Sequence, residues 1–528
     1  MDRGGSGPLP QSARMEIHQI NVGQGDSILI INRDLAKVKQ AIEDKPETPP
    51  PNPLDYVPFA LSKKVPLLGT VTQALLIDGG DDCYAGNVGD YLIEQGIANR
   101  PSGSDGVYCK NFSVLVSHWH DDHMQGVKGA YGQRDATPIE TRKPKRKRGK
   151  GAAYKKPPLF IRPATMYVPK PRDREGPRRK IYRNEMARVA TAGSLAEPSK
   201  RVDIGPGGLA KGATGPPFTI DLGKGIGDIP IVAHVLAAAQ SVYFDTGPVQ
   251  IASKGRGVDQ NDTSVVLVIE YGSFRYFCAG DIAGNGVAAG GNTSKNAMDT
   301  KKKNNYSLTH ADVESTLGPA LERYFQPTVK YEADKPKCLY PGQCTVMKLS
   351  HHGSNSSNDV YLLATLRPKV VVGSSGLRHR FHWHPTAEVI NRITTAATGK
   401  WDVRPVKVKP PPPSQPPPPP LPPVPNEIAA VYLTEVADKI GKRGKTFDVD
   451  LQGAKIMGSI VVRPIDESVL AVQQATAAGK SKLSFQVYGN GLRTDLTKAG
   501  LSYSVRATVD KAKSGFYPIE PDVHEVAY

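Results

Sequence analysis

The stretch FSVLVSHWHDDH, residues 112–123, joins an apolar segment directly to three histidines and two aspartates. A short apolar run that ends in polar residues is typical of a buried strand, so this cluster lies at a strand end. Neutral imidazoles and carboxylates are ligands for zinc, manganese or iron. In an extended chain, His118 and His120 point to the same side and can reach one ion. The stretch therefore predicts a metal centre.

Strands and helices are predicted on both sides of this stretch. Residues 15–32 predict two strands around a glycine turn, and residues 71–80 predict a buried strand that ends in Asp-Gly-Gly. Further strands are predicted within 229–238, 264–284, 345–354, 369–375, 427–436, 454–465 and 482–489, and helices within 87–97, 312–325 and 384–393. This order predicts an α/β (α+β) fold with two sheets and helices outside them.

The composition predicts long insertions in this core. The 528 residues include 52 glycines and 46 prolines, nearly a fifth of the chain, against roughly 12% in average globular proteins. We expect residues 1–14 to precede a core spanning 15–489 and residues 490–528 to extend it. The expected insertions are 33–70, 131–225, 285–308 and 402–425.

Hydropathy and cysteine content bear on the compartment. There is no stretch of about 18 apolar residues, so no membrane-spanning helix is expected. The first residues lack the apolar segment of a signal peptide. Five scattered cysteines do not predict a disulfide framework, and we expect Cys338 and Cys344 to be free thiols. These features favour a cytoplasmic protein without membrane contact.

Several motifs occur in an order that resembles one family. They are VGQGDSILI (22–30), IDGG (77–80), NDTSVVLVI (261–269), CAGDIAG (278–284), KLSHHGS (348–354) and HPTAEVI (384–390). Together with H-x-H-x-D-H, they resemble the metallo-β-lactamase fold hydrolases. Within that group they resemble the soluble metallo-hydrolase domain of the ComEC family of DNA-uptake proteins. The resemblance implies an αββα sandwich. It also implies that residues after the proline-rich segment complete the sandwich.

The resemblance implies two divalent metal ions, zinc or manganese. The implied ligands are His118 and His120 for the first ion, Asp122, His123 and His352 for the second, and Asp281 bridging both. His351 is the alternative to His352. The family's first site has a further histidine, for which His234 is the only nearby candidate. Because His234 lies in an apolar alternating strand, we expect a core histidine.

The resemblance also implies a mechanism in which a metal-activated water attacks the substrate. Asp122 would orient this water, and His351 or His384 would protonate the leaving oxygen. The backbone amides of Gly353 and Ser354 could approach a phosphate, although an ordinary turn explains them equally well. His384 could instead be a helix cap or a surface histidine.

Two glycines and two aspartates in these motifs have simpler interpretations. We expect Gly23 and Gly25 to permit a tight turn, because no helix and no third glycine follow them. Asp26 and Asp78 are expected to support turns or ligands rather than to bind metal themselves.

A basic segment predicts a polyanionic partner. Residues 141–180 contain 16 Lys or Arg against 2 Asp or Glu, including Lys145, Arg146, Lys147 and Arg148. Such side chains bind phosphates without sequence specificity, although a solvated loop is the alternative. The proline run at 409–425 predicts a polyproline II spacer, or a docking segment for a proline-binding protein.

Taken together, these features predict a metal-dependent phosphodiesterase that hydrolyses nucleic acid, with DNA as the expected substrate. One alternative is a hydrolase of small phosphoesters such as phosphocholine esters or cyclic nucleotides. Another is a catalytically silent protein that binds nucleic acid.

Overall fold

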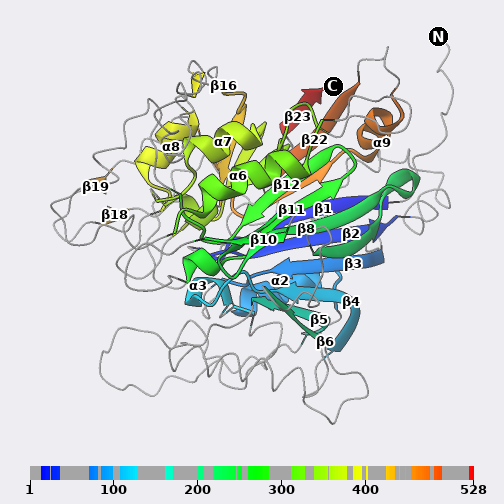
Figure 1. The fold of residues 1–528 in the computed structure, drawn as a ribbon. Helices are drawn as coiled ribbons and strands as arrows, with labels where there is room; N and C mark the ends of the chain where they lie inside the picture. The colour runs from blue at the N-terminus through cyan, green and yellow to red at the C-terminus, as the bar shows by residue number, and fades with distance from the viewer. Residues whose placement is uncertain are drawn as a thin grey trace, which may run out of the picture.

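The computed structural model describes most of the predicted core. The described residues are 13–23, 25–35, 70–80, 85–98, 107–124, 126–127, 161–169, 200–205, 218–244, 247–251, 260–284, 311–327, 338–354, 356–376, 384–394, 400–401, 424–434, 439–440, 446–447, 454–475, 481–489 and 522–528. They form a mixed α/β structure with two large mixed sheets and few helices, as the sequence predicted at this level (Figure 1).

The first sheet has nine strands in the order β23-β22-β21-β1-β2-β3-β4-β5-β6. Its strands are β1 (Ala13–Gln19), β2 (Ile28–Asp34), β3 (Thr70–Ile77), β4 (Val107–Leu115), β5 (Ile161–Pro169), β6 (Lys200–Ile204), β21 (Ile460–Pro464), β22 (Lys482–Gly489) and β23 (Asp522–Ala527). Strands β3 to β6 run parallel, so β3 and β4 end at the same edge of the sheet.

The second sheet has ten strands, with β10-β9-β8-β11-β12-β13-β14-β17-β20 in line and β7 beside β8. They are β7 (Thr219–Lys224), β8 (Pro230–Ala238), β9 (Ser241–Phe244), β10 (Gly247–Gln250), β11 (Val266–Tyr271), β12 (Phe274–Ala279), β13 (Val346–Lys348), β14 (Val370–Gly373), β17 (Ala430–Leu433) and β20 (Lys455–Ile456). Strands β12, β13, β14, β17 and β20 run parallel. Two small ribbons pair β15 (Lys400–Trp401) with β16 (Val424–Pro425) and β18 (Lys439–Ile440) with β19 (Thr446–Phe447).

The two sheets share a hydrophobic core. Ile17 and Ile30 of the first sheet belong to the same buried cluster as Leu267 and Tyr276 of the second. Because side chains alternate across a strand, the intervening residues form separate cores on the outer faces. The helices are α2 (Ala85–Glu94), α3 (Asp121–Met124), α6 (Val313–Tyr324), α7 (Val360–Leu366), α8 (Ala387–Thr394) and α9 (Asp466–Gln474). Helix α2 packs on the first sheet, and α6, α7 and α8 pack on the second (Figure 1).

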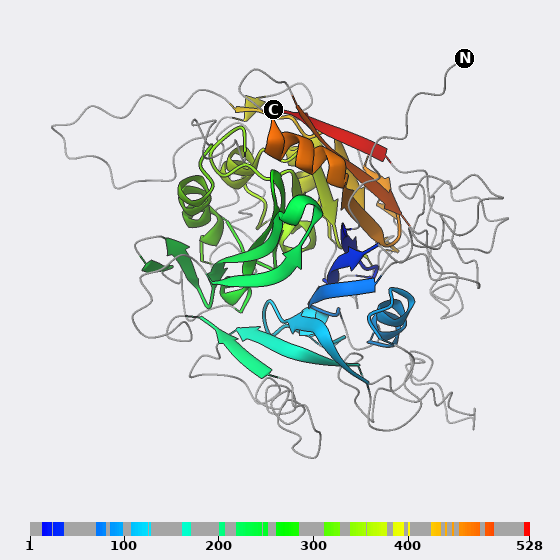
Figure 2. The same cartoon turned by 90° about the vertical axis from the view of Figure 1, so that its right-hand side faces the viewer.

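The extent of the insertions differs from the sequence prediction. The range 131–225 contains β5, β6 and β7, which join the sheets, and 490–528 ends in β23. Figure 2 shows these additions at opposite edges of the first sheet, with β5 and β6 at one edge and β23, in red, at the other. Basic residues, prolines and glycines interrupt the apolar alternation of these strands, so the sequence did not predict them. After the proline-rich segment, β17 joins the second sheet and β21 joins the first.

Candidate metal centre

The parallel strands bring the predicted cluster together at their carboxyl ends. Asp78 follows β3, the residues 118–123 follow β4, and Asp281 follows β12. A 3₁₀ turn, Ser350–Gly353, follows β13 and carries both His351 and His352. The ends of parallel strands are where α/β proteins usually bind ligands. Long-range sheet pairing therefore gathers residues from four separate segments into one buried group.

His123, Asp281 and His352 converge on one point, and Asp122 approaches His352. The His123 Nε2 atom lies 3.0 Å from Asp281 Oδ1 and 3.2 Å from His352 Nε2. The His352 Nε2 atom lies 3.5 Å from Asp281 Oδ1 and 3.5 Å from Asp122 Oδ2. Nitrogen ligands at 2.0–2.1 Å in a tetrahedral zinc site lie roughly 3.3–3.4 Å apart. The observed spacings match the edges of such a site.

The hydrogen-bond partners of Nδ1 in His123 and His352 determine whether Nε2 of the same ring can bind a metal. His123 Nδ1 lies 2.8 Å from Asp78 Oδ2, and His352 Nδ1 lies 3.2 Å from the carbonyl oxygen of Ser374. Carbonyl and carboxylate oxygens only accept hydrogen bonds, so both Nδ1 atoms carry the hydrogen. Both Nε2 atoms then present lone pairs to each other and to Asp281. A cation between them resolves this convergence of acceptors.

The second carboxylate oxygen of Asp281 faces other histidines. Asp281 Oδ2 lies 3.8 Å from His118 Nε2 and 3.5 Å from His351 Nε2. His118, His120 and Asp281 form a second group whose ligand atoms lie within 4.8 Å of one another. The buried His118 Nε2 has no hydrogen-bond partner among the described residues. The two oxygens of Asp281 thus point to two different sets of potential ligands.

Electrostatics at the centre favour positive charge. Burial would lower the pKa of His352, but Asp281 and Asp26 raise it to about 9. Burial would likewise lower the pKa of His123, but Asp281 and Asp78 raise it well above its ordinary value. Burial would raise the pKa of Asp281, yet the neighbouring histidines hold it well below its ordinary range. A cation can take the place that protons otherwise occupy.

Backbone strain shapes the turn that carries the paired histidines. His351 and His352 have positive φ angles of 50° and 53°, which is uncommon for residues other than glycine. The buried Asn358 side chain accepts a hydrogen bond from Ser350 N and donates one to Ser350 O. Asn358 N in turn donates to Glu314 Oε1. These bonds fix the start of the turn and orient His352 into the centre.

The other predicted site residues have varied positions. The His384 ring lies 5.5 Å from that of His351, but His384 precedes α8 by three residues and does not start the helix. Ser354 N donates to the His351 carbonyl. This amide is therefore not available to a phosphate, contrary to one of the two interpretations of the sequence. The neighbouring Gly353 has a φ of 83°, and a Cβ there would meet Pro385, so the turn interpretation suffices. Residues 145–148 lie outside the described residues.

Three further expectations concern residues beside the centre. His234 is half-buried, instead of fully buried as a core histidine would be, and contacts Tyr324 and Phe325. The Asp78 side chain accepts hydrogen bonds from Ser117 N and Oγ and supports His123, as expected. Asp26, which we did not predict as a potential ligand, belongs to a group with His123, Asp281 and His352 that could hold one ion. The only sequence feature that could have indicated a role for Asp26 is its position after Gly25 in the motif VGQGDSILI.

Close glycine contacts hold this end of the molecule together. A Cβ on Gly25 would lie 2.5 Å from Asp122 O, and one on Gly79 would lie 2.3 Å from Val127 N. A Cβ on Gly126 would lie 1.5 Å from Gly79 O. The glycines are therefore required for close backbone approach, which agrees with the turn interpretation of Gly25.

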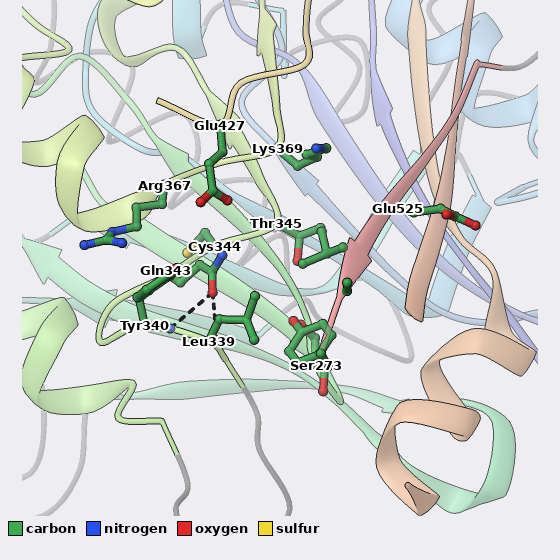
Figure 3. A pocket seen from close by; sticks show the side chains of 13 residues that line it. Ser273, Leu339, Tyr340, Gln343, Cys344, Thr345, Arg367, Lys369, Glu427 and Glu525 are labelled. Atoms are coloured by element: carbon green, nitrogen blue, oxygen red, sulfur yellow. Dashed lines mark hydrogen bonds between the residues drawn. The ribbon is translucent and has the colours of Figure 1, made fainter. Parts of the chain in front are cut away.

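A cavity of about 260 Å³ lies away from the histidines (Figure 3). Ser273, Thr345 and Lys369 line it, and they precede β12, β13 and β14, whereas the histidines follow these strands. Two charged groups along it have partners: Glu525 pairs with Lys482, and Arg367 stacks on Tyr340, which also lines the cavity. The cavity and the candidate metal centre occupy opposite ends of the parallel strands.

The remaining expectations concern membranes and cysteines. No helix within the described residues is long and apolar enough to span a membrane. Cys109, Cys278, Cys338 and Cys344 are buried free thiols, which confirms the prediction for the last two. Cys83 lies outside the described residues. A scan of protein-family models and a search of curated proteins both found no match to this chain.

Proposed function

We propose that this chain is a metal-dependent phosphodiesterase with a metallo-β-lactamase fold that hydrolyses nucleic acid, with DNA as its substrate. The observation that carries the proposal is the two-sided contact of Asp281. One oxygen faces His123 and His352, and the other faces His118 and His351. A carboxylate shared between two histidine sets suits a two-metal hydrolytic site.

The layer order and the motifs support this assignment of fold. Helix α2 lies outside the first sheet and α6, α7 and α8 lie outside the second, whereas α9 packs Val469 and Val472 into the core that the sheets share. This agrees with the αββα sandwich implied by the H-x-H-x-D-H, AGD and HHGS motifs. A shared fold does not define a substrate, so the substrate assignment depends on charge.

The residues divide into metal-binding and proton-transferring roles. His118 and His120 would hold one ion, and Asp122, His123 and His352 the other, with Asp281 between them. Two divalent ions there would supply a water of lowered pKa and neutralise charge on the substrate oxygens. The partly exposed His351 and His384 lie close together at the edge of this group. Either can donate a proton to the leaving oxygen.

Charge supports a polyanionic substrate. The chain carries a formal net charge of +17, and the basic run at 141–180 follows the H-x-H-x-D-H motif in sequence. Each lysine or arginine that neutralises a phosphate releases counterions, so binding weakens steeply with salt. A small phosphoester would not show such strong salt dependence.

Incubation of labelled single- and double-stranded DNA with the purified chain, with added Mn²⁺ or Zn²⁺, tests the proposal. We expect degradation that chelator abolishes and that Asp281→Asn lowers roughly 100-fold or more, because the bridging charge is lost. His234→Gln serves as the matched control, because His234 contacts the rings of Tyr324 and Phe325 and not the residues of the candidate metal centre.

Three outcomes contradict the proposal in distinguishable ways. Intact DNA with turnover of bis-p-nitrophenyl phosphate indicates a small-phosphoester hydrolase. Metal and DNA binding without turnover of either substrate indicates a catalytically silent binding protein. DNA degradation that is equal in Asp281→Asn and the unaltered chain would rule out this centre as the active site.

A further inference from the structure

Lys348, the last residue of β13, is buried. Val346 belongs to the core between the sheets and Met347 to the outer core, so the alternation turns Lys348 toward the space between the sheets. Its side chain is 0% exposed. Lysine is almost never fully buried unless it is paired. The metal centre itself gives no reason for a cation here, so Lys348 requires its own explanation.

The partner of Lys348 comes from the other sheet. Lys348 Nζ lies 2.5 Å from Asp26 Oδ2 and donates to Ala279 O at 2.8 Å. Asp26 is 1% exposed and lies in the loop between β1 and β2. Burial would lower the pKa of Lys348, yet Asp26 raises it, so the two groups form a charged pair. This ion pair joins the two sheets beneath the centre.

The ion pair contacts the back edges of both metal-binding histidines. Asp26 Oδ1 lies 3.5 Å from His352 Nδ1, and Asp26 Oδ2 lies 3.7 Å from His123 Nδ1. The Nε2 atoms of the same rings face Asp281 on the other side. Asp26 is also fixed through its backbone, since Asp26 N donates to Asp122 O and Gly80 N donates to Asp26 O. Its carboxylate is therefore held where it can set the orientation of both rings.

We propose that Lys348 and Asp26 act together as positioning residues that hold His123 and His352 with their Nε2 atoms directed at the metal. This inference rests on the proposed metal-dependent function. The Nδ1–H groups of these rings are accepted by Asp78 and by the Ser374 carbonyl, and Asp26 supports the same two rings by its negative charge at 3.7 and 3.5 Å. Loss of groups that orient a ligating histidine typically weakens metal binding. Simple charge repulsion predicts the reverse, because removing a nearby ammonium would strengthen binding of a cation.

Metal affinity distinguishes positioning of the rings, whose loss weakens Zn²⁺ binding, from charge repulsion, whose loss strengthens it. Zn²⁺ affinity of the full chain would be measured by competition with a chromogenic chelator, and coordination by the visible absorption of bound Co²⁺. We expect Lys348→Met and Asp26→Asn each to weaken Zn²⁺ binding roughly 10- to 100-fold and to change the Co²⁺ spectrum. The matched control is Lys369→Met, which removes a lysine at the opposite end of the neighbouring strand.

The double variant tests whether the two residues act as one unit. Lys348→Met with Asp26→Asn should weaken Zn²⁺ binding no more than the weaker-binding single variant, because a shared interaction is lost only once. Unchanged or tighter Zn²⁺ binding in the single variants, with an unchanged Co²⁺ spectrum, would overturn the inference even if thermal stability falls. Should Lys348→Met fail to fold, Lys348→Gln, which keeps a donor for Ala279 O, takes its place, because Asp26 could itself contact the ion. A wild-type chain that binds neither Zn²⁺ nor Co²⁺ would instead overturn the proposed function.

Discussion

At the scale of single residues, Gly79 is a position where one added methyl group should destabilise the fold. A Cβ there would lie 2.3 Å from Val127 N, although the φ of Gly79 is not left-handed. Gly79→Ala should therefore destabilise the fold by about 1–3 kcal/mol through overpacking. It should also weaken Zn²⁺ binding, because Asp78 and the helix that carries His123 must move apart. Thermal unfolding and metal titration measure both effects.

Gly96 provides the matched control for this prediction. It has a φ of +74°, and a Cβ there would meet nothing within 4 Å. Gly96→Ala should cost roughly 1 kcal/mol of backbone strain and leave Zn²⁺ affinity unchanged. Equal Zn²⁺ affinities in the two variants would argue against the glycine contacts as a determinant of the centre.

The residues of the centre differ in how well the sequence could predict them. His118, His120 and His123 stand together after one strand, and this local density of ligand types was sufficient to predict their grouping. Asp26 and Lys348 are each unremarkable locally, and they meet only because β13 and the loop after β1 lie at one edge of the folded sheets. Such a contact depends on tertiary structure, which a single sequence does not reveal.

At the scale of elements, the start of α9 contains a buried carboxyl group whose charge opposes folding. Burial raises the pKa of Asp466 to about 7, although Tyr271 OH donates a hydrogen bond to it. Its ordinary value is 3.8, so between these values the folded state binds more protons than the unfolded chain. Stability then falls as pH rises from about 4 to 7, because the slope follows the proton difference between the two states.

The corresponding prediction concerns Asp466→Asn. This variant keeps an acceptor for Tyr271 and removes the titrating group, so its melting temperature should vary less between pH 4 and 8. Relative to the unaltered chain, it should gain several degrees at the alkaline end, since one pKa unit corresponds to about 1.4 kcal/mol. Calorimetry across this range checks the result, with the exposed Glu94→Gln in α2 as control. Parallel pH profiles for Asp466→Asn and the unaltered chain would refute the assignment.

Elements were predictable where local pattern and burial agreed. The strand at 266–271 and the helix at 313–324 carry the apolar periods of a buried strand and an amphipathic helix, and both were predicted. Strand β5 carries Pro163 and Pro169, which argue against a strand in sequence alone. It forms because β4 and β6 pair with its two sides.

At the scale of the whole molecule, two different sites lie at the two ends of the parallel strands. The carboxyl ends hold the candidate metal centre, and the opposite ends hold the cavity that Tyr528 and its neighbours line (Figure 3). Strand β23 contributes to this second end: Tyr528 OH donates to Ser273 O, and Tyr432 OH donates to Asp522 Oδ2. Changes in β23 should therefore lower the stability of the fold without changing its affinity for metal.

A chain that stops at residue 521 tests this separation. Loss of the half-buried Tyr528 and of both hydrogen bonds should lower stability by roughly 2–4 kcal/mol, while Zn²⁺ affinity stays within about twofold. Denaturant unfolding and chelator competition give the two values. Val523→Ser is the matched control, because Val523 is 57% exposed and its change should affect neither. If the truncated chain stays folded but loses Zn²⁺ binding, then β23 supports the metal centre through the core between the sheets, and the two ends of the molecule are energetically coupled.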